Sequence, residues 1–274
     1  METSNSAPFS AEQLLQRVEQ ASVRKAHLPS LSLLMLGILA GAFIGFGAMA
    51  NTFLLSDPLT SMSVTRILGG LIFSIGLIMV VVAGAELFTG NNLLVMAFVD
   101  RKITLVELLR NWTIVLVGNA LGAFLLAVLV YQSGHLDLLG GKVALQYLAV
   151  ADTKCAMPFI KAFVSGILCN MLVCFAVWMS FACRSVTDKI LAVIFPVTVF
   201  VAAGFEHVVA NLYLFPVAMM ALDEPSTYIH LNASGVVGNL IPVLLGNMVG
   251  GGVFVGLVYY LVYGKQPEKD PSKK

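Results

Sequence analysis

The stretch Val201-Ala202-Ala203-Gly204-Phe205-Glu206-His207 decides the fold of this 274-residue chain. It places an acid and an imidazole inside an apolar run from about Ile190 to Leu222. Ionisable groups are costly inside a bilayer and usually mark a pathway, a relay or a counter-ion. A similar stretch, Val81-Val82-Ala83-Gly84-Ala85-Glu86, lies 120 residues earlier. Two such stretches indicate a pore built from two related halves, with one histidine at its centre.

The composition is that of an integral membrane protein. Hydrophobic residues make up 58% of the chain and charged residues 11%, and the mean hydropathy is +0.90. Several apolar runs exceed the roughly 18–20 residues that a helix needs to span a bilayer. Helices satisfy every backbone polar group within one segment, so we expect an all-α membrane protein. The sequence contains no basic patch that would indicate binding to nucleic acid. Its four cysteines include no CxxC pair, so we expect buried thiols and no metal site.

Six spans are predicted, and the second and fifth are broken. They cover about 31–55, 66–99 (interrupted at 86–92), 110–131, 159–182, 188–221 (interrupted at 205–211) and 236–263. Residues 1–30 lack the apolar core of a cleavable signal. Within them, Ser10-Ala11-Glu12-Gln13 predicts a capping box that starts an amphipathic helix, lying on the membrane surface or on a neighbouring subunit. Residues 31–264 form the membrane domain, and residues 265–274 form a polar tail.

The distribution of Lys and Arg predicts that both termini are cytoplasmic. With that orientation, twelve of the sixteen basic residues lie inside and only Arg66, Lys142, Lys154 and Lys161 lie outside. The count requires each broken span to cross the membrane once.

The two halves repeat beyond the two acidic motifs. The segment from Asn111 to Asn119 resembles the segment from Asn239 to Asn247, 128 residues later. Leu36-Gly37-Ile38-Leu39 resembles Ser165-Gly166-Ile167-Leu168. Spans one to three, about 31–131, therefore repeat as spans four to six, about 159–263. Because three is odd, the repeats have opposite orientations, which indicates a substrate site near the midplane.

The first break is Glu86-Leu87-Phe88-Thr89-Gly90-Asn91-Asn92. Gly90, Asn91 and Asn92 favour turns and left-handed backbone. Irregular backbone at this depth is tolerated only where protein buries it or where it lines a cavity. We expect Glu86 to have a structural role in capping a half-helix, and the Thr89 hydroxyl to line the pore.

The second break runs from Gly204 to Asn211. Glu206 matches Glu86 and is expected to share its structural role, whereas His207 stands where the first half has Leu87. A symmetric scaffold does not need this difference, which favours a function for His207. An imidazole titrates near neutral pH and can pass a proton to an anion. The alternative is a neutral core histidine bonded to a carbonyl group.

Other candidate pore residues have ordinary explanations as well. Lys154 would attract anions if it lies at a pore mouth, whereas a lysine such as Lys161 commonly extends to the membrane interface. A set of bulky apolar residues would be core residues by default, but narrow apolar constrictions can also gate a pore. The set comprises Phe73, Leu77, Phe88, Val173 and Phe200.

Three segments together resemble the formate/nitrite transporter family. They are the blocks Ala83–Asn91, Val173–Met179 and Ala203–Asn211, and the resemblance covers about residues 12 to 263. It implies an aquaporin-like six-helix bundle, a homopentamer and one pore in each subunit. By position, His207 resembles the central pore histidine, Thr89 its hydroxyl partner, and Asn170 a polar pore residue. Lys154 resembles the vestibule lysine, Glu206 adjoins the pore histidine, and Leu87 joins the five apolar residues in the family's constrictions.

The resemblance implies transport of a small monovalent anion across a bacterial inner membrane. Phe88-Thr89-Gly90-Asn91 differs from formate channels of enteric type, which carry Thr-Ser after the phenylalanine. The segment from Ala176 to Lys189 is closer to formate members, so formate is the expected substrate, with nitrite or hydrosulfide as alternatives. We expect a pH-dependent channel or proton-coupled transporter, in which Lys154 draws in the anion and the protonated acid passes the apolar rings. Direct protonation by His207 is the alternative.

Two other classes of function are less consistent with the sequence. An intramembrane enzyme could use His207 and Glu206 as acid–base groups, but no nucleophile accompanies them at membrane depth. A water or glycerol channel would carry paired Asn-Pro-Ala motifs, which the chain lacks. We therefore expect a transporter without cofactors or metals, and not an enzyme.

Overall fold

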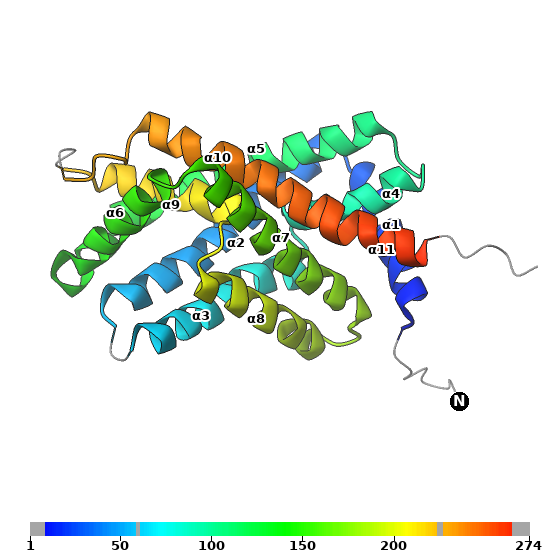
Figure 1. Cartoon of the computed structure of the whole chain (residues 1–274), viewed down its shortest axis with the longest axis horizontal. Helices are drawn as coiled ribbons and strands as arrows, with labels where there is room; N and C mark the ends of the chain where they lie inside the picture. Colours follow the sequence, from blue (N-terminus) through cyan, green and yellow to red (C-terminus); the bar gives the residue numbers. More distant parts are fainter. Residues whose placement is uncertain (1–8, 59–60, 224–226, 265–274) are drawn as a thin grey trace, which may run out of the picture.

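The computed structural model describes residues 9–58, 61–223 and 227–264, and every regular element in these ranges is a helix (Figure 1). Six helices are long and apolar enough to cross a membrane, which confirms the predicted fold class. They are α2 (Ser30–Ser56), α3 (Met62–Ala83), α5 (Leu105–Gln132), α7 (Phe159–Ala182), α8 (Val186–Ala203) and the continuous helix Ala233–Tyr263. The last consists of α10 (Ala233–Met248), the π-helical segment η3 (Val249–Leu257) and α11 (Val258–Tyr263).

Two glycines in left-handed conformation end the broken helices. Gly84 (φ 82°) follows α3, and Gly204 (φ 77°) follows α8. A residue without Cβ adopts this conformation at little cost, which makes glycine the usual helix terminator. Each chain then resumes as short helices: η1 (Gly90–Leu94) with α4 (Val95–Val99) in the first half, and α9 (Val208–Met220) in the second.

The breaks differ in detail from the predicted interruptions at 86–92 and 205–211. Both begin earlier, at the left-handed glycines. The prediction of left-handed backbone at Gly90, Asn91 and Asn92 was wrong, because these residues form the 3-10 turn η1 with ordinary helical geometry. The chain has already reversed at Gly84, so the later residues are free to restart a helix.

The two halves pack in the same way and run in opposite directions. Gly37 of α2 meets Gly118 of α5, and Gly166 of α7 meets Gly246 of α10, with backbones so close that a Cβ at Gly37 or Gly166 would lie 3.2 Å from the partner's Cα. Helices α3 and α8 pack together across the halves. The start of α3 and the end of α8 line one cavity, so these helices are antiparallel, as the predicted inverted repeat requires.

Helix α1 (Ala11–Ala26) begins with the predicted capping box, in which Ser10 Oγ accepts from Gln13 N–H. Leu14, Leu15 and Val18 are buried, as the apolar face predicted. The predicted partner of this face was the membrane surface or a neighbouring subunit, but the structure gives the buried face of the helix a partner within the subunit. It packs on its own chain, against a cluster that includes Trp178 and Tyr260. Burying its apolar face within the subunit removes the need for a lipid or a neighbour.

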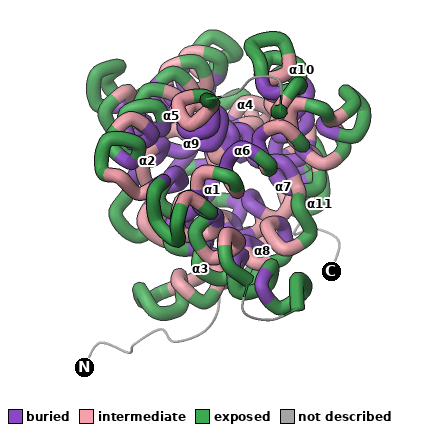
Figure 2. Tube along the Cα trace, turned by 90° about the vertical axis from the view of Figure 1, so that its left-hand side faces the viewer, coloured by how far each residue is buried: buried purple, intermediate pink, exposed green. Residues whose placement is uncertain are grey.

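Two helical segments were not predicted: η2 (His135–Gly141) and α6 (Lys142–Cys155). Their sequences are too short and too polar to signal a span. Helix α6 is nevertheless important, because its last turn carries Lys154. Buried residues gather in the interior of the bundle and exposed residues on its outer turns (Figure 2). Many of the exposed residues are large and apolar, as expected for helices that face lipid or a second subunit.

Candidate functional site

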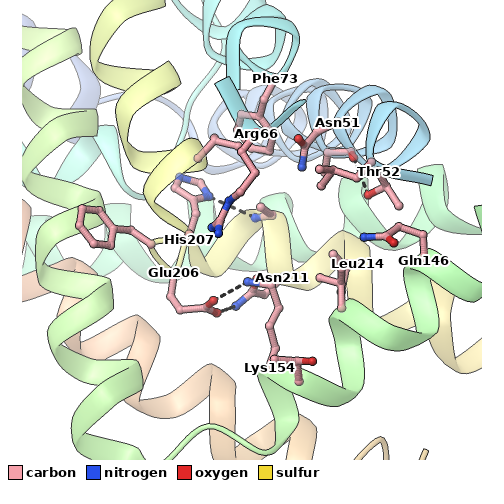
Figure 3. Close-up of a pocket in the computed structure, with 18 of the residues that line it drawn as sticks. Asn51, Thr52, Arg66, Phe73, Gln146, Lys154, Glu206, His207, Asn211 and Leu214 are labelled. Carbon is pink, nitrogen blue, oxygen red and sulfur yellow. Dashed lines mark hydrogen bonds and ion pairs between the residues drawn. The ribbon is translucent and has the colours of Figure 1, made fainter. Parts of the chain in front are cut away.

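Two cavities open into the bundle from opposite ends. The first, here called the Lys154 cavity, has a volume of about 420 Å³ and is lined by Arg66, Phe73, Lys154, Phe200 and His207, among others (Figure 3). The second, the Lys25 cavity, has a volume of about 290 Å³. Its wall includes Arg17, Lys25, Leu77, Leu87 and Lys189. Each cavity therefore combines basic residues at its walls with apolar residues.

The cavities face each other along α3. This helix lines the Lys154 cavity with Arg66 and Phe73, and the Lys25 cavity with Leu77 and Val80. Phe73 and Leu77 are one turn apart, a rise of roughly 6 Å. The barrier between the cavities is thus about one helical turn thick, and it is mainly apolar.

His207 and Thr89 meet within this barrier, although 118 residues separate them in the sequence. Thr89 Oγ1 lies 3.0 Å from His207 Nε2. Both residues are almost completely buried, and His207 also lines the Lys154 cavity. The ring of Phe200 stacks on the imidazole at a centroid distance of 5.9 Å.

The other nitrogen of His207 caps a helix. Ala210 N–H donates to His207 Nδ1 at 3.1 Å, so the imidazole is the N-cap of α9. A nitrogen that accepts a hydrogen bond carries no proton. The neutral ring therefore carries its proton on Nε2, which donates to Thr89 Oγ1. This arrangement differs from the simple core histidine considered above, whose ring would be bonded to a carbonyl group.

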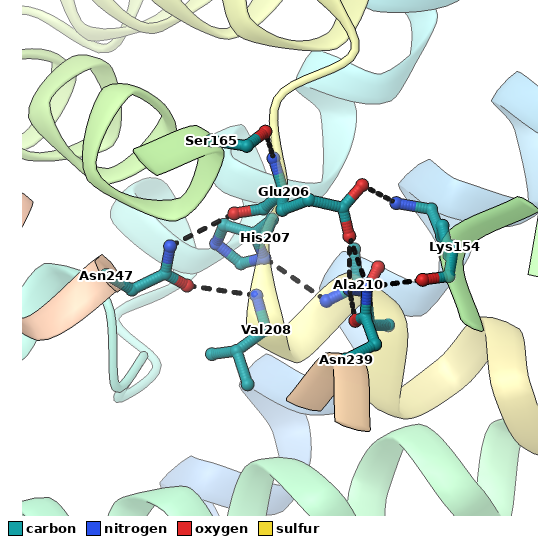
Figure 4. A network of polar contacts seen from close by, with 9 residues as sticks. Lys154, Ser165, Glu206, His207, Val208, Ala210, Asn239 and Asn247 are labelled. Carbon is teal, nitrogen blue, oxygen red and sulfur yellow. Dashed lines mark hydrogen bonds and ion pairs between the residues drawn. The ribbon is translucent and has the colours of Figure 1, made fainter. Parts of the chain in front are cut away.

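Lys154 belongs to a buried polar network in the second half of the chain (Figure 4). Its Nζ donates to Glu206 Oε1 at 2.5 Å. Glu206 Oε2 accepts from Asn211 Nδ2 at 2.7 Å and from Asn239 Nδ2 at 3.3 Å. Asn239 Nδ2 also donates to the Lys154 carbonyl group. Glu206, whose carboxylate is itself held by Asn211 and Asn239, thus fixes the lysine at the cavity wall.

The first half contains the same network, built around Lys25. Lys25 Nζ lies 3.2 Å from Glu86 Oε2 and donates to Asn91 Oδ1 at 2.8 Å. Asn91 Nδ2 donates to Glu86 Oε2 and to Asn111 Oδ1. Asn111 Nδ2 donates to the Lys25 carbonyl group, as Asn239 does to Lys154. The expected role of Glu86 as a helix cap was wrong, because its carboxylate binds a lysine and an asparagine instead.

The sequence analysis missed Lys25, although a signal was present. Lys25 and Lys154 are 129 residues apart, the same offset as Gly37 and Gly166. Extending the repeat into the N-terminal segment would have paired the two lysines. The polar character of residues 1–30 concealed this, because the segment is not itself a span.

Two further asparagines fix the extended backbone at the breaks. Asn119 Oδ1 accepts from Phe88 N–H, and its Nδ2 donates to the carbonyl groups of Gly37 and Glu86. Asn247 makes the equivalent bonds with Val208, Gly166 and Glu206. Backbone groups freed by the helix breaks thus find partners inside the protein, as membrane depth requires.

The remaining predicted residues fall into two groups. Phe73 and Phe200 line the Lys154 cavity, where their rings meet edge to face at 5.7 Å, and Leu77 and Leu87 line the Lys25 cavity. Phe88, Val173 and Asn170 are buried and line neither cavity. Asn170 Nδ2 instead donates to the carbonyl groups of Thr89 at 3.2 Å and Asn247 at 2.7 Å, so it joins the two halves beside the barrier.

The described residues contain no group of three or more His, Cys, Asp or Glu side chains arranged to hold a metal ion. The chemistry that the cavities offer is therefore that of two lysine-based networks, a hydroxyl–imidazole pair and a short apolar barrier. Such a barrier opposes bare ions, because a desolvated charge is costly.

Comparison with known proteins agrees with this geometry. Residues 12–261 match the family model for formate/nitrite transporters. The chain is 42% identical to the uncharacterized transporter YrhG of Bacillus subtilis (strain 168), with 96% of each chain covered. It is 39% identical to the formate channel FocA of Escherichia coli (strain K12), over 89% of this chain and 91% of the relative.

Solved structures show the same similarity. A pentameric formate channel with formate bound superimposes with a TM-score of 0.80 at 41% identity, covering 86% of this chain and 98% of that chain. An ion channel of the same family superimposes with a TM-score of 0.82 at 30% identity, covering 93% and 99%. The family consists of transporters and channels and not of enzymes. This multi-pass membrane protein belongs to the formate/nitrite transporter family.

Proposed function

We propose that this protein transports formate through a pore in each subunit of a homopentamer in the cytoplasmic membrane of a bacterium. The observation that carries the proposal is the contact between Thr89 Oγ1 and His207 Nε2, in an apolar barrier between two lysine-lined cavities. Relatives described as formate channels support the choice of substrate, and the pentameric neighbour supports the assembly.

The proposed orientation puts the Lys154 cavity outside and the Lys25 cavity inside. It rests on the twelve-to-four distribution of basic residues and places both termini in the cytoplasm. An anion arriving from outside would then enter the Lys154 cavity, and one leaving the cell would enter the Lys25 cavity.

The proposed mechanism begins with attraction of the formate anion to the positively charged side of the Lys154 network. Beyond it lie Phe73 and Phe200, where an unpaired carboxylate would lose its hydration. Apolar surroundings favour the neutral form of an acid. Formate therefore takes up a proton from water in the cavity, crosses the barrier as formic acid and releases the proton in the opposite cavity. One proton moves with each formate.

In this scheme His207 orients the acid and does not supply the proton. Its Nδ1 already accepts a hydrogen bond from Ala210 N–H, so a proton there would abolish the N-cap of α9. Its Nε2–H and the hydroxyl of Thr89 form a donor pair that can bind the oxygens of a small acid. This geometry favours passage of the neutral acid over direct protonation by His207.

Nitrite and hydrosulfide are alternatives, because each is a small monovalent anion with a neutral protonated form. All three anions carry one negative charge, so the charges of the cavity walls do not select formate over the other two. Relative rates of transport decide which of the three is the substrate.

The test is flux of formate, nitrite and hydrosulfide into proteoliposomes, measured in parallel across pH 4 to 8. Formate flux that exceeds the other two and rises as pH falls is the expected result. His207→Asn and His207→Phe should lower formate flux but keep its rise at low pH, because the proton comes from water; loss of the pH dependence would instead favour direct protonation by His207. His230→Asn should keep the full flux, because His230 is an exposed residue outside both cavities. Light scattering of the detergent-solubilised protein should give a pentamer for all variants.

Two results would reject the proposal. Absence of formate flux in a pentameric wild-type protein would reject the substrate. Full retention of formate flux in both His207 variants would reject the role of the histidine.

A further inference from the structure

The Lys154 cavity contains a second cation, Arg66, that the transport scheme has not used. Arg66 belongs to the second turn of α3, while Lys154 reaches the same cavity from α6 (Figure 3). Its guanidinium group lies over Gly204, so close that a Cβ there would be 2.5 Å from Nη2. The missing side chain of Gly204 therefore leaves the space that the guanidinium occupies.

The two cations of this cavity differ in whether a carboxylate neutralises their charge. Lys154 Nζ is 2.5 Å from Glu206 Oε1, and Glu206 is the only carboxylate in the cavity wall described here. The guanidinium of Arg66 makes no hydrogen bond or ion pair within the described part of the chain. The Lys154–Glu206 pair is neutral as a whole, so Arg66 provides the net positive charge of the cavity.

The position of Arg66 has a physical explanation that leaves its donors free. Gly204 ends α8, and the C-terminal end of a helix carries partial negative charge that stabilises a nearby cation. The carbonyl groups of Phe200 and Val201 already accept from Phe205 and Gly204 N–H groups. The helix end therefore attracts the guanidinium without occupying its N–H groups.

We propose that Arg66 is the anion-binding residue at the mouth of the Lys154 cavity, where it binds the incoming carboxylate before the acid reaches His207. This inference deepens the proposed function and rests on it. A guanidinium presents two parallel N–H groups that match the two oxygens of a carboxylate, whereas an ammonium group acts as a point charge. The same geometry fits the two oxygens of nitrite, but it offers no bidentate match to hydrosulfide.

The test compares Arg66→Gln with Lys161→Gln in proteoliposomes. Lys161 is a matched control, because it is an exposed basic residue predicted on the same side of the membrane and outside the cavity. The measurement is the initial rate of formate flux against formate concentration, at low and at high potassium chloride. Arg66→Gln should raise the half-saturating concentration on the order of five-fold, the effect of losing one partly exposed ionic contact, with little change in maximal rate.

Salt distinguishes an electrostatic role from a structural one. Added salt screens exposed charges, so it should raise the half-saturating concentration of the wild type and of Lys161→Gln. It should have much less effect on Arg66→Gln. Arg66→Lys should recover the salt dependence but only part of the affinity, because the lysine keeps the charge and loses the paired donors.

Two outcomes would overturn the inference while leaving formate transport intact. One is an Arg66→Gln pentamer whose concentration and salt dependence equal those of the wild type. The other is a loss of maximal rate with unchanged salt dependence in an assembled pentamer, which would make Arg66 a structural contact. A wild type without formate flux would instead reject the proposed function.

If Arg66→Gln does not assemble into a pentamer, Arg66→Lys tests the inference instead. An arginine-selective dicarbonyl reagent added from the Lys154 side should inhibit wild-type flux, and formate should protect against it. Arg66→Lys should resist the reagent. Equal inhibition of both proteins would reject the inference.

Discussion

Thr89 Oγ1 lies 3.0 Å from His207 Nε2, a contact between side chains of the two inverted halves at the barrier between the cavities. The imidazole is oriented from its other side by Ala210 N–H, so its Nε2 proton points to the threonine. The threonine backbone is itself held by Asn170.

Replacing the Thr89 hydroxyl should therefore impair transport. Thr89→Val keeps the volume but removes the acceptor of His207 Nε2–H, and an unsatisfied buried donor costs about 1–3 kcal/mol. We expect formate flux in proteoliposomes to fall roughly ten-fold or more. Thr89→Ser retains the hydroxyl and should keep most of the flux. Equal flux in the valine and serine variants would show that the hydroxyl has no part in transport.

The Lys25 network predicts a rescue by a second substitution. Lys25→Met should destabilise the protein in detergent, because the buried carboxylate of Glu86 loses its cation. Adding Glu86→Gln removes that charge and should restore part of the thermal stability, as a double-mutant cycle would reveal. The corresponding cycle of Lys154→Met and Glu206→Gln should have the same sign. Strictly additive effects in both cycles would contradict the networks.

Two glycines that have different functions in the fold should tolerate alanine to different degrees. A Cβ at Gly84 meets no atom within 4 Å, so Gly84→Ala should cost only the strain of left-handed backbone, about 1–2 kcal/mol. A Cβ at Gly41 would clash with the backbone of Asn119, where α2 and α5 touch. Gly41→Ala should therefore prevent assembly, measured by size-exclusion chromatography, whereas Gly84→Ala should lower the melting temperature by a few degrees. Similar behaviour of the two variants would argue against this packing.

Attachment of α1 should depend on pH through Glu19. This carboxylate is 3% exposed, and its burial raises its pKa above the usual value, although Lys102 partly opposes the shift. The folded state then binds the proton more tightly than the unfolded segment. Stability of the attached helix should consequently be greater below the ordinary pKa of a glutamate and decline as pH rises through the raised value.

Hydrogen exchange of residues 11–26, corrected for intrinsic rates, measures this effect. Wild-type protection should be greater at pH 4 than at pH 8, and the difference should shrink in Glu19→Gln, which has no charge to bury. Glu107→Gln is the control, because hydrogen bonds from Thr104 lower the pKa of that carboxylate. An equal pH dependence in wild type and Glu19→Gln would exclude Glu19 as the cause.

Much of the fold was predictable because its signals are local. Apolar run length identified the spans, and the capping box at Ser10 identified the start of α1. The predicted interruptions at 86–92 and 205–211 begin within two residues of the observed breaks, although α9 already restarts at Val208. Helix α6 escaped prediction, because no local pattern distinguishes it from a polar loop.

The sequence by itself determined that this protein crosses the membrane six times, with two broken helices in inverted repeats. These properties follow from hydropathy and from similarity at a constant offset. Only the tertiary structure decided that α1 packs on its own subunit, that Lys25 joins Glu86, and that Arg66 occupies the space over Gly204. Those contacts join segments that lie far apart in the chain. Helix packing sets the distances between the contacting atoms, and residues adjacent in sequence do not encode them.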